Sequence, residues 1–165
     1  MQTRKKDVIS RKELIKNVVH LIERGNAHAS LEDALQNIPF SLLGQKPANL
    51  PYSIWQLAEH IRISQWDILG FSQNAKHISP KWPDGYWPSE MAPESETAWQ
   101  KCIETIQADR NAFVALVKNA GESLDKVFEY GDGQSVLKEA LVLADHNSYH
   151  TGELIIMRRL LNAWK

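Results

Sequence analysis

The chain has 165 residues, of which 43% are hydrophobic and 24% charged, and its formal net charge is −1. These values fit one globular domain, residues 1–165, that is long enough to bury a core. A charge this close to zero gives no overall attraction to nucleic acid or anionic membranes, and no basic patch or nucleic-acid motif is visible. We therefore expect a small molecule as the principal partner.

A single cysteine, Cys102, excludes an intrachain disulfide and argues against a secreted scaffold. The N-terminal residues lack the apolar core of a signal peptide, and no run of about 18 apolar residues is present to span a bilayer. These features predict a soluble, cytoplasmic protein. Cys102 lies in a helical pattern, which favours a packed side chain over a nucleophile.

Hydrophobic spacing predicts four long helices and hence an all-α bundle. Ser10 offers a capping residue for the first helix, and Gly25 is expected to end it. A loop-rich stretch with one short helical turn from Ser30 follows. Residues 127–130 could form a brief extended segment but no sheet. The four long helices are expected at residues 10–24, 53–73, 94–119 and 135–163.

The second helix carries a polar notch in its apolar stripe. Ser64 and Gln65 stand where the stripe needs apolar residues, and His60 lies at its edge, near Ser64 and Asp67 by helical angle. Such a notch predicts a lined pocket, with Ser64 and Asp67 in its wall.

Residues 78–93 contain four prolines and three large aromatic residues, which excludes a helix. Proline stiffness and aromatic bulk predict an ordered loop packed over another part of the molecule. Trp82, Tyr86 and Trp87 are therefore candidates for the rim of the pocket.

The fourth helix is apolar nearly all round at residues 136–144, which predicts deep burial there. Further along, Gly152 lowers helix propensity by about 1 kcal/mol, and we expect it to let another helix approach closely.

Three histidines are the strongest functional signal. His146 and His150 are four residues apart, so both imidazoles lie on one face of the fourth helix. His60 from the second helix could complete a site with three nitrogen ligands and one open coordination position. The alternative is that these histidines are hydrogen-bonded core residues.

Three neutral nitrogens suit zinc or nickel, whereas calcium and magnesium prefer oxygen ligands. Carboxylates normally orient metal-bound imidazoles, and Asp67 and Glu139 are candidates for this role by helical position.

The histidine pattern resembles that of the DinB/YfiT-like superfamily. The resemblance rests on His60, on Ala-Asp-His-Asn-Ser-Tyr-His-Thr-Gly-Glu at residues 144–153, and on Arg-Arg-Leu-Leu at 158–161. Residues 25–28, 30–33, 50–60 and 82–88 also look like one bacterial branch of that family.

This resemblance implies a four-helix bundle in an up-down-down-up arrangement with a long crossover. It implies a metal held by His60, His146 and His150, and pairing of the chain as a homodimer. Some members of the family are metal-dependent transferases or isomerases that use thiols such as bacillithiol or mycothiol, and others are described as hydrolases.

Three hypotheses about function follow. The first is a metal-dependent transferase that joins a low-molecular-weight thiol to a small electrophile. The second is a metal-dependent hydrolase with Glu139, Glu153 or His28 as base, although the explicit His-Glu-x-x-His helix is absent. The third is a non-catalytic module that binds a metal or a small ligand.

Overall fold

The computed structural model describes residues 9–24 and 27–164. Apart from one isolated bridge between Val127 and Ser135, the regular elements of these residues are helical. The α-helices are α1 (Arg11–Arg24), α2 (Leu31–Leu35), α3 (Ile54–Gln73), α4 (Glu96–Asn119) and α5 (Val136–Leu160), and short 3₁₀ turns occupy Phe40–Leu42, Asp84–Tyr86 and Gly121–Ser123.

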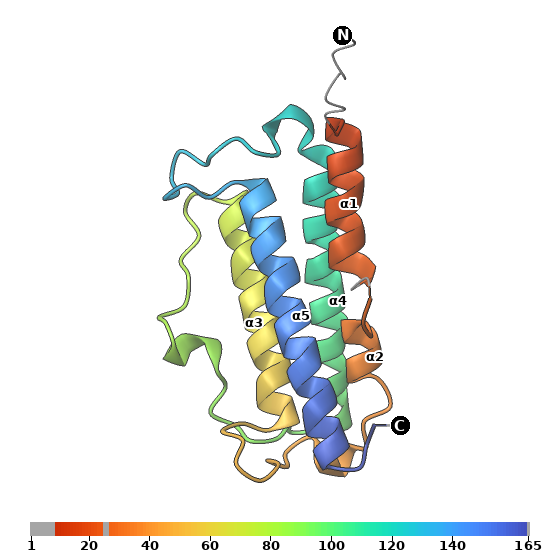
Figure 1. Ribbon diagram of the computed structural model, residues 1–165. Coiled ribbons are helices and arrows are strands. Elements are labelled where there is room, and N and C mark those ends of the chain that lie inside the picture. The colour runs from red at the N-terminus through yellow and green to blue at the C-terminus, as the bar shows by residue number, and fades with distance from the viewer. Residues whose placement is uncertain (1–8, 25–26, 165) are drawn as a thin grey trace.

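The four long helices form a bundle in which α1 and α5 run in one direction and α3 and α4 in the other (Figure 1). Both the four-helix bundle and the up-down-down-up order are confirmed. Because α3 and α4 are parallel, the chain between them must return along the length of the bundle, and residues 74–95 form this crossover beside α3 (Figure 1).

Serine side chains cap the starts of the long helices. Ser53 forms a full capping box with Gln56, while Ser95 and Ser135 each accept a hydrogen bond from the backbone three residues on. The cap at Ser95 moves the start of α4 two residues beyond the predicted position. α5 ends at Leu160 rather than at residue 163, and the expected role of Gly25 lies outside the described residues.

A polar layer divides the apolar core of the bundle into two clusters. One cluster joins α2 and the start of α3 to the start of α4 and the end of α5. The other joins α1 to the end of α4 and the start of α5. Between them, buried Gln65 donates a hydrogen bond to the Ile106 carbonyl at 3.0 Å and accepts one from Asn147 at 2.9 Å. The histidines of α3 and α5 lie at this level.

The first half of α5 is less buried than its composition predicts. Leu141 is 49% exposed and Val142 is 44% exposed, so the expectation of deep burial over residues 136–144 is wrong for these two. α5 contacts α3, α1, α2 and α4, and Leu141 and Val142 lie on the side of α5 that is exposed among the described residues. None of the described helices has both the length and the apolarity that crossing a bilayer requires.

Truncation of Phe113 should test the second core cluster. This α4 side chain is 1% exposed, and the Phe113→Ala change would leave a cavity, so we expect the free energy of unfolding to fall by about 3–5 kcal/mol. Chemical denaturation measures the change. The Lys101→Ala variant, changed at an exposed residue of the same helix, serves as control and should change the free energy of unfolding by no more than about 0.5 kcal/mol. Equal losses in both variants would contradict the placement of Phe113 in the core.

Candidate metal centre

Three imidazoles from two helices meet in the polar layer. His60 projects from α3, and His146 and His150 project from successive turns of α5. The Nε2 atom of His60 lies 3.1 Å from Nε2 of His150 and 3.1 Å from Nε2 of His146. One ligand atom from each residue falls within 4.8 Å of the others, so the structure brings the predicted trio together.

The outer nitrogens of two rings fix how the inner nitrogens are protonated. Nδ1 of His60 lies 3.0 Å from the Tyr86 carbonyl oxygen, and Nδ1 of His150 lies 2.6 Å from the Glu153 carboxylate. Both oxygens are acceptors, so each Nδ1 carries the hydrogen and each Nε2 of a neutral ring presents a lone pair. Two lone pairs 3.1 Å apart repel each other unless a cation lies between them. The third ring, His146, has a buried Nδ1 without a hydrogen-bond partner.

Burial keeps these imidazoles neutral. Desolvation lowers the pKa of His60 to about 4, and desolvation together with the two neighbouring imidazoles lowers the pKa of His146 to about 3. The pKa of His150 is lowered by burial too, although Glu153 acts in the opposite direction. At neutral pH all three nitrogens are therefore in the protonation state that a metal ligand needs.

A continuous chain of side-chain contacts links His150 to His60 around the site. The Glu153 oxygen that does not face His150 accepts a hydrogen bond from the Tyr52 hydroxyl at 2.5 Å. Tyr52 stacks on Trp87 with ring centroids 4.9 Å apart, and Trp87 stacks on His60 at 4.0 Å with the planes 3° apart. The rings of His60 and His150 are thus held in place through Trp87, Tyr52 and Glu153.

The histidines form one wall of a cleft of about 590 Å³. The five residues that the sequence places in a pocket all line it, and so do residues of the outer side of α5. Its lining consists of His60, Ser64, Asp67, Ile68, Trp82, Tyr86, Trp87, Val142, Asp145, His146, Tyr149 and His150.

Asp67 anchors the crossover rather than a histidine of the trio. One of its oxygens lies 2.7 Å from Nε2 of His77, and the other accepts a hydrogen bond from the Tyr86 hydroxyl at 2.6 Å. Burial and this carboxylate raise the pKa of Tyr86. Asp67 therefore holds Tyr86, whose carbonyl in turn orients His60. At Gly70 a Cβ would lie 2.5 Å from Nδ1 of His77, so the absence of a side chain at this position leaves room for the imidazole.

The carboxylate that orients a histidine of the trio is Glu153, and not Asp67 or Glu139 as the sequence analysis expects. Glu139 is 8% exposed, its pKa is raised by burial, and it is not among the residues of the cleft wall. The reason is spacing: Glu153 is three residues after His150 and reaches its Nδ1, whereas Glu139 is seven residues before His146, two turns away.

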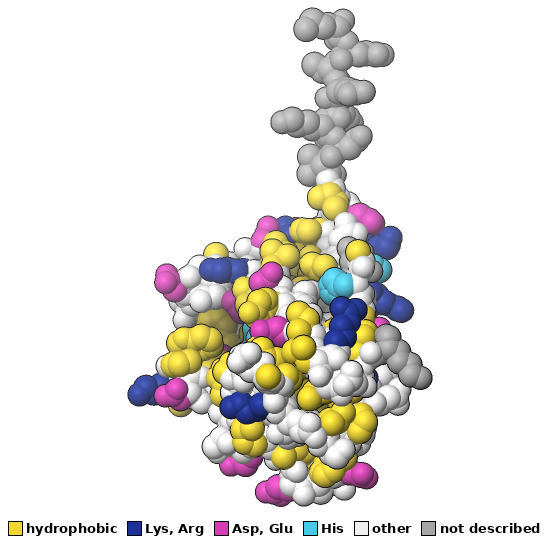
Figure 2. All heavy atoms as spheres, turned by 60° about the horizontal axis from the view of Figure 1, so that its bottom comes forward, with side chains coloured by type: hydrophobic (Ala, Val, Ile, Leu, Met, Phe, Trp, Pro, Cys, Tyr) yellow, Lys and Arg dark blue, Asp and Glu magenta, His cyan; other side chains and the backbone are white. Residues whose placement is uncertain are grey.

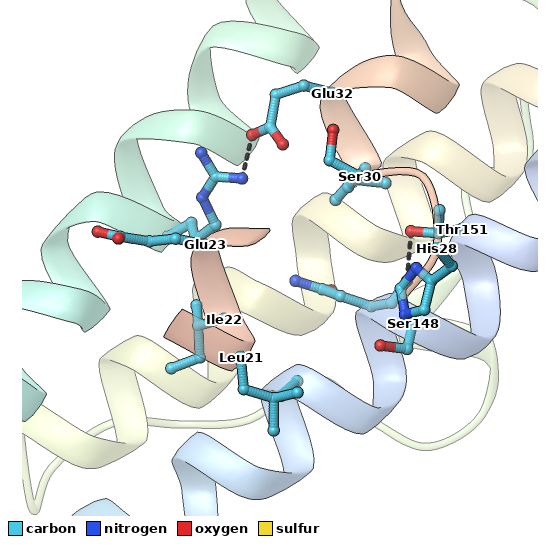
Figure 3. Close-up of a pocket in the computed structure, with 12 residues that line it drawn as sticks. Leu21, Ile22, Glu23, His28, Ser30, Glu32, Ser148 and Thr151 are labelled. Carbon is cyan, nitrogen blue, oxygen red and sulfur yellow. Dashed lines mark hydrogen bonds and ion pairs between the residues drawn. The ribbon is translucent and has the colours of Figure 1, made fainter. Parts of the chain in front are cut away.

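His28 lies apart from the trio. It lines a separate pocket with Ser148 and Thr151, on another side of α5 (Figure 3), and its Nδ1 lies 2.9 Å from the Ala29 carbonyl oxygen. The structure therefore does not bring this candidate base to the cleft. Two residues that the sequence analysis did not single out, Tyr52 and His77, do support the site.

The metal-free protein should lose stability as the pH falls. The folded-state pKa values of His60 and His146, about 4 and about 3, lie below the ordinary value of 6.5. The unfolded chain therefore binds more protons below about pH 6.5, so the free energy of unfolding decreases as the pH falls from there through the folded values. Denaturant unfolding of the apoprotein at several pH values measures the slope. A His60→Gln, His146→Gln double variant should show a weaker dependence of the free energy of unfolding on pH. An unchanged dependence would refute the attribution of this effect to the two buried imidazoles.

Comparison with known proteins adds one finding. A family model described as the DinB superfamily matches residues 26–154, which include all three histidines of the cluster. No curated protein and no solved structure gives a match to this chain. The family model covers well over half of the chain and includes α3 and the part of α5 that carries the cluster. The chain thus belongs to the DinB superfamily.

Proposed function

We propose that His60, His146 and His150 hold one divalent metal ion, zinc or nickel, and that the protein is a metal-dependent transferase. Its substrates would be a low-molecular-weight thiol and a small electrophile. The observation that carries this proposal is the convergence of the Nε2 atoms in the wall of an aromatic cleft.

The donor set fits such an ion. Nitrogens about 2.0–2.1 Å from a common ion at tetrahedral angles are roughly 3.3 Å from one another. The Nε2 atom of His60 lies 3.1 Å from that of His146 and 3.1 Å from that of His150, and the ligand atoms of all three residues lie within 4.8 Å of one another. The rings are neutral, and Glu153 and the Tyr86 carbonyl hold two of them from behind, as carboxylates and carbonyls do at metal sites. Three protein ligands leave a coordination position for a reactant.

A bound divalent ion would favour the anionic form of a thiol or a water placed beside it. The electrophile would lie against the aromatic part of the cleft lining, to which Trp82, Tyr86 and Tyr149 belong. In the proposed reaction a carbon–sulfur bond forms and the bond from that carbon to its leaving group breaks. The bonding pair departs with the leaving group, and the thiol proton passes to solvent at the cleft mouth.

Hydrolysis is the weaker alternative because the bases that the sequence analysis names for it are not free in the cleft. Both oxygens of Glu153 are engaged, one by His150 and one by Tyr52, and neither Glu139 nor His28 lines the cleft. A non-catalytic binding module would have the same pocket but no turnover.

Metal content tests the first half of the proposal. Protein purified without a histidine tag should bind about one zinc or nickel ion per chain, and His60→Ala and His150→Ala should each abolish stoichiometric binding. Elemental analysis after dialysis measures it. The His20→Ala variant, changed at an exposed histidine of α1, is the matched control and should keep its metal.

Glu153→Gln gives a graded comparison within the same experiment. It leaves all three ligands in place but weakens the acceptor at His150 Nδ1, so metal affinity should fall by about 10–100-fold without disappearing. Full metal occupancy in the His60→Ala and His150→Ala variants would disprove the site.

Turnover tests the second half. Metal-loaded protein should accelerate the reaction of a thiol such as cysteine or bacillithiol with chlorodinitrobenzene, followed by absorbance, and His150→Ala should not. Nitrophenyl acetate without added thiol separates the two chemistries, because turnover there would favour a hydrolase. Stoichiometric metal with no activity above that of His150→Ala on either substrate would reject catalysis and favour a binding module.

A further inference from the structure

The cleft beside the histidine trio contains carboxylates but no basic side chain. Among the described residues that line it, the acidic ones are Asp67 and Asp145, and no lysine or arginine is present. Figure 2 shows a recess of this kind on the molecular surface, where histidine is visible between hydrophobic and acidic side chains. The wall that the protein offers to a ligand is therefore negatively charged, which favours a cationic ligand over an anionic one.

Only one of the two carboxylates is available to a ligand. Both oxygens of Asp67 are engaged, one by His77 and the other by Tyr86. Asp145 is exposed, and within the part of the chain that the structure describes it forms no salt bridge. Its neighbours one turn away on α5 are all uncharged, namely Leu141, Val142, Ser148 and Tyr149. No cation of the same helix therefore competes with a ligand for this carboxylate.

Aromatic rings line the same cleft. Tyr149 lies one turn after Asp145, is 65% exposed, and meets the ring of His150 edge to face with centroids 4.9 Å apart. On the crossover, Trp82 is 71% exposed and packs edge to face against Tyr86 with centroids 5.4 Å apart. These three rings of tryptophan and tyrosine all belong to the cleft lining. The face of an aromatic ring attracts an ammonium group, and the face of tryptophan does so most strongly.

We propose that the cleft takes a substrate with a positively charged alkylammonium group, held by the Asp145 carboxylate and by the rings of Trp82 and Tyr149. The ammonium group donates hydrogen bonds to the carboxylate, and its carbon substituents lie against the rings. In the proposed transfer reaction this group belongs to the electrophile, because the thiol would take the open position at the metal. A volume of about 590 Å³ has room for both reactants. The inference rests on the proposed function, since it names the charge of one of its substrates.

The position of Asp145 also removes an obstacle to such a substrate. A metal ion in the histidine trio would repel an ammonium group in the same cleft. Asp145 immediately precedes His146 in the chain, so its negative charge lies beside the ligands and offsets part of this repulsion. A lysine or arginine at the same position would have the opposite effect and would favour an electrophile that carries a carboxylate.

Three small ligands of similar size and different charge test the inference: benzylammonium, benzyl alcohol and benzoate. Isothermal titration calorimetry of the full chain, freed of metal by a chelator, measures their binding without any contribution from the ion or from turnover. Benzylammonium should bind at least about fivefold more tightly than benzyl alcohol, and benzoate should bind most weakly. Because no metal is present, this result does not depend on whether the protein is a transferase.

Asp145→Asn keeps the size of the side chain and removes its charge. It should bring the affinity for benzylammonium to within about twofold of that for benzyl alcohol and leave the affinity for the alcohol unchanged. Trp82→Ala should weaken benzylammonium binding by about two- to fivefold. Glu104→Gln is the matched control, because it removes one negative charge from an exposed residue of α4 outside the cleft lining, and it should keep the preference for the cation.

Circular dichroism confirms that each variant is helical. Equal binding of benzylammonium and benzyl alcohol, tighter binding of benzoate, a preference that survives Asp145→Asn, an affinity unchanged by Trp82→Ala, or no saturable binding below about 10 mM would overturn the proposal. Stoichiometric metal and thiol transfer would in that case leave the proposed function standing. A preference for the cation in a chain that binds no metal would instead refute the transferase and support the ammonium site.

Discussion

The site depends on one unfavourable electrostatic contact, the facing lone pairs of His60 and His150. Each Nδ1 is committed to an oxygen acceptor, so the Nε2 atoms that lie 3.1 Å apart cannot hydrogen-bond to each other as neutral rings. A proton between them would relieve the repulsion, but burial opposes a charged imidazole and lowers the pKa of both rings. A divalent cation relieves the repulsion without protonation, which is why the pair suits a metal better than a hydrogen-bonded core.

The polar layer around this contact is connected by hydrogen bonds between α3, α4 and α5, although the buried Oδ1 of Asn147 has no hydrogen-bond partner among the described residues. Gln65 bridges the Ile106 carbonyl and the Asn147 side chain, and the hydroxyl of Thr151 donates to the Asn147 carbonyl. Apolar clusters above and below exclude water and fix the level of α3 against that of α5. The two helices therefore bring the imidazoles together as rigid supports, and a shift of either helix by one turn, about 5.4 Å, would separate the ligands.

The sequence predicts the histidine trio but only part of what holds it. The spacing of His146 and His150 follows from the helical repeat, and the polar notch beside His60 marks the facing helix. Glu153 is also within helical reach of His150, so its role could have been found by the same reasoning that favours Asp67 and Glu139. Tyr52 could not, because it reaches Glu153 across 101 residues of sequence. His77 meets Asp67 only because the chain after α3 turns back over Gly70, a tertiary contact without a periodic signal.

One helix carries both the ligand pair and part of the remaining cleft wall. Along α5, Asp145 and Tyr149 on the outer side immediately precede His146 and His150 on the side that faces α3, and adjacent residues differ by about 100° around the axis. The same two turns therefore present imidazoles to α3 and line the cleft with a carboxylate and an aromatic ring. The exposed Leu141 and Val142 lie on the outer side of this helix, so an apolar composition does not by itself predict burial: a side chain of α5 is buried only where it faces the rest of the bundle.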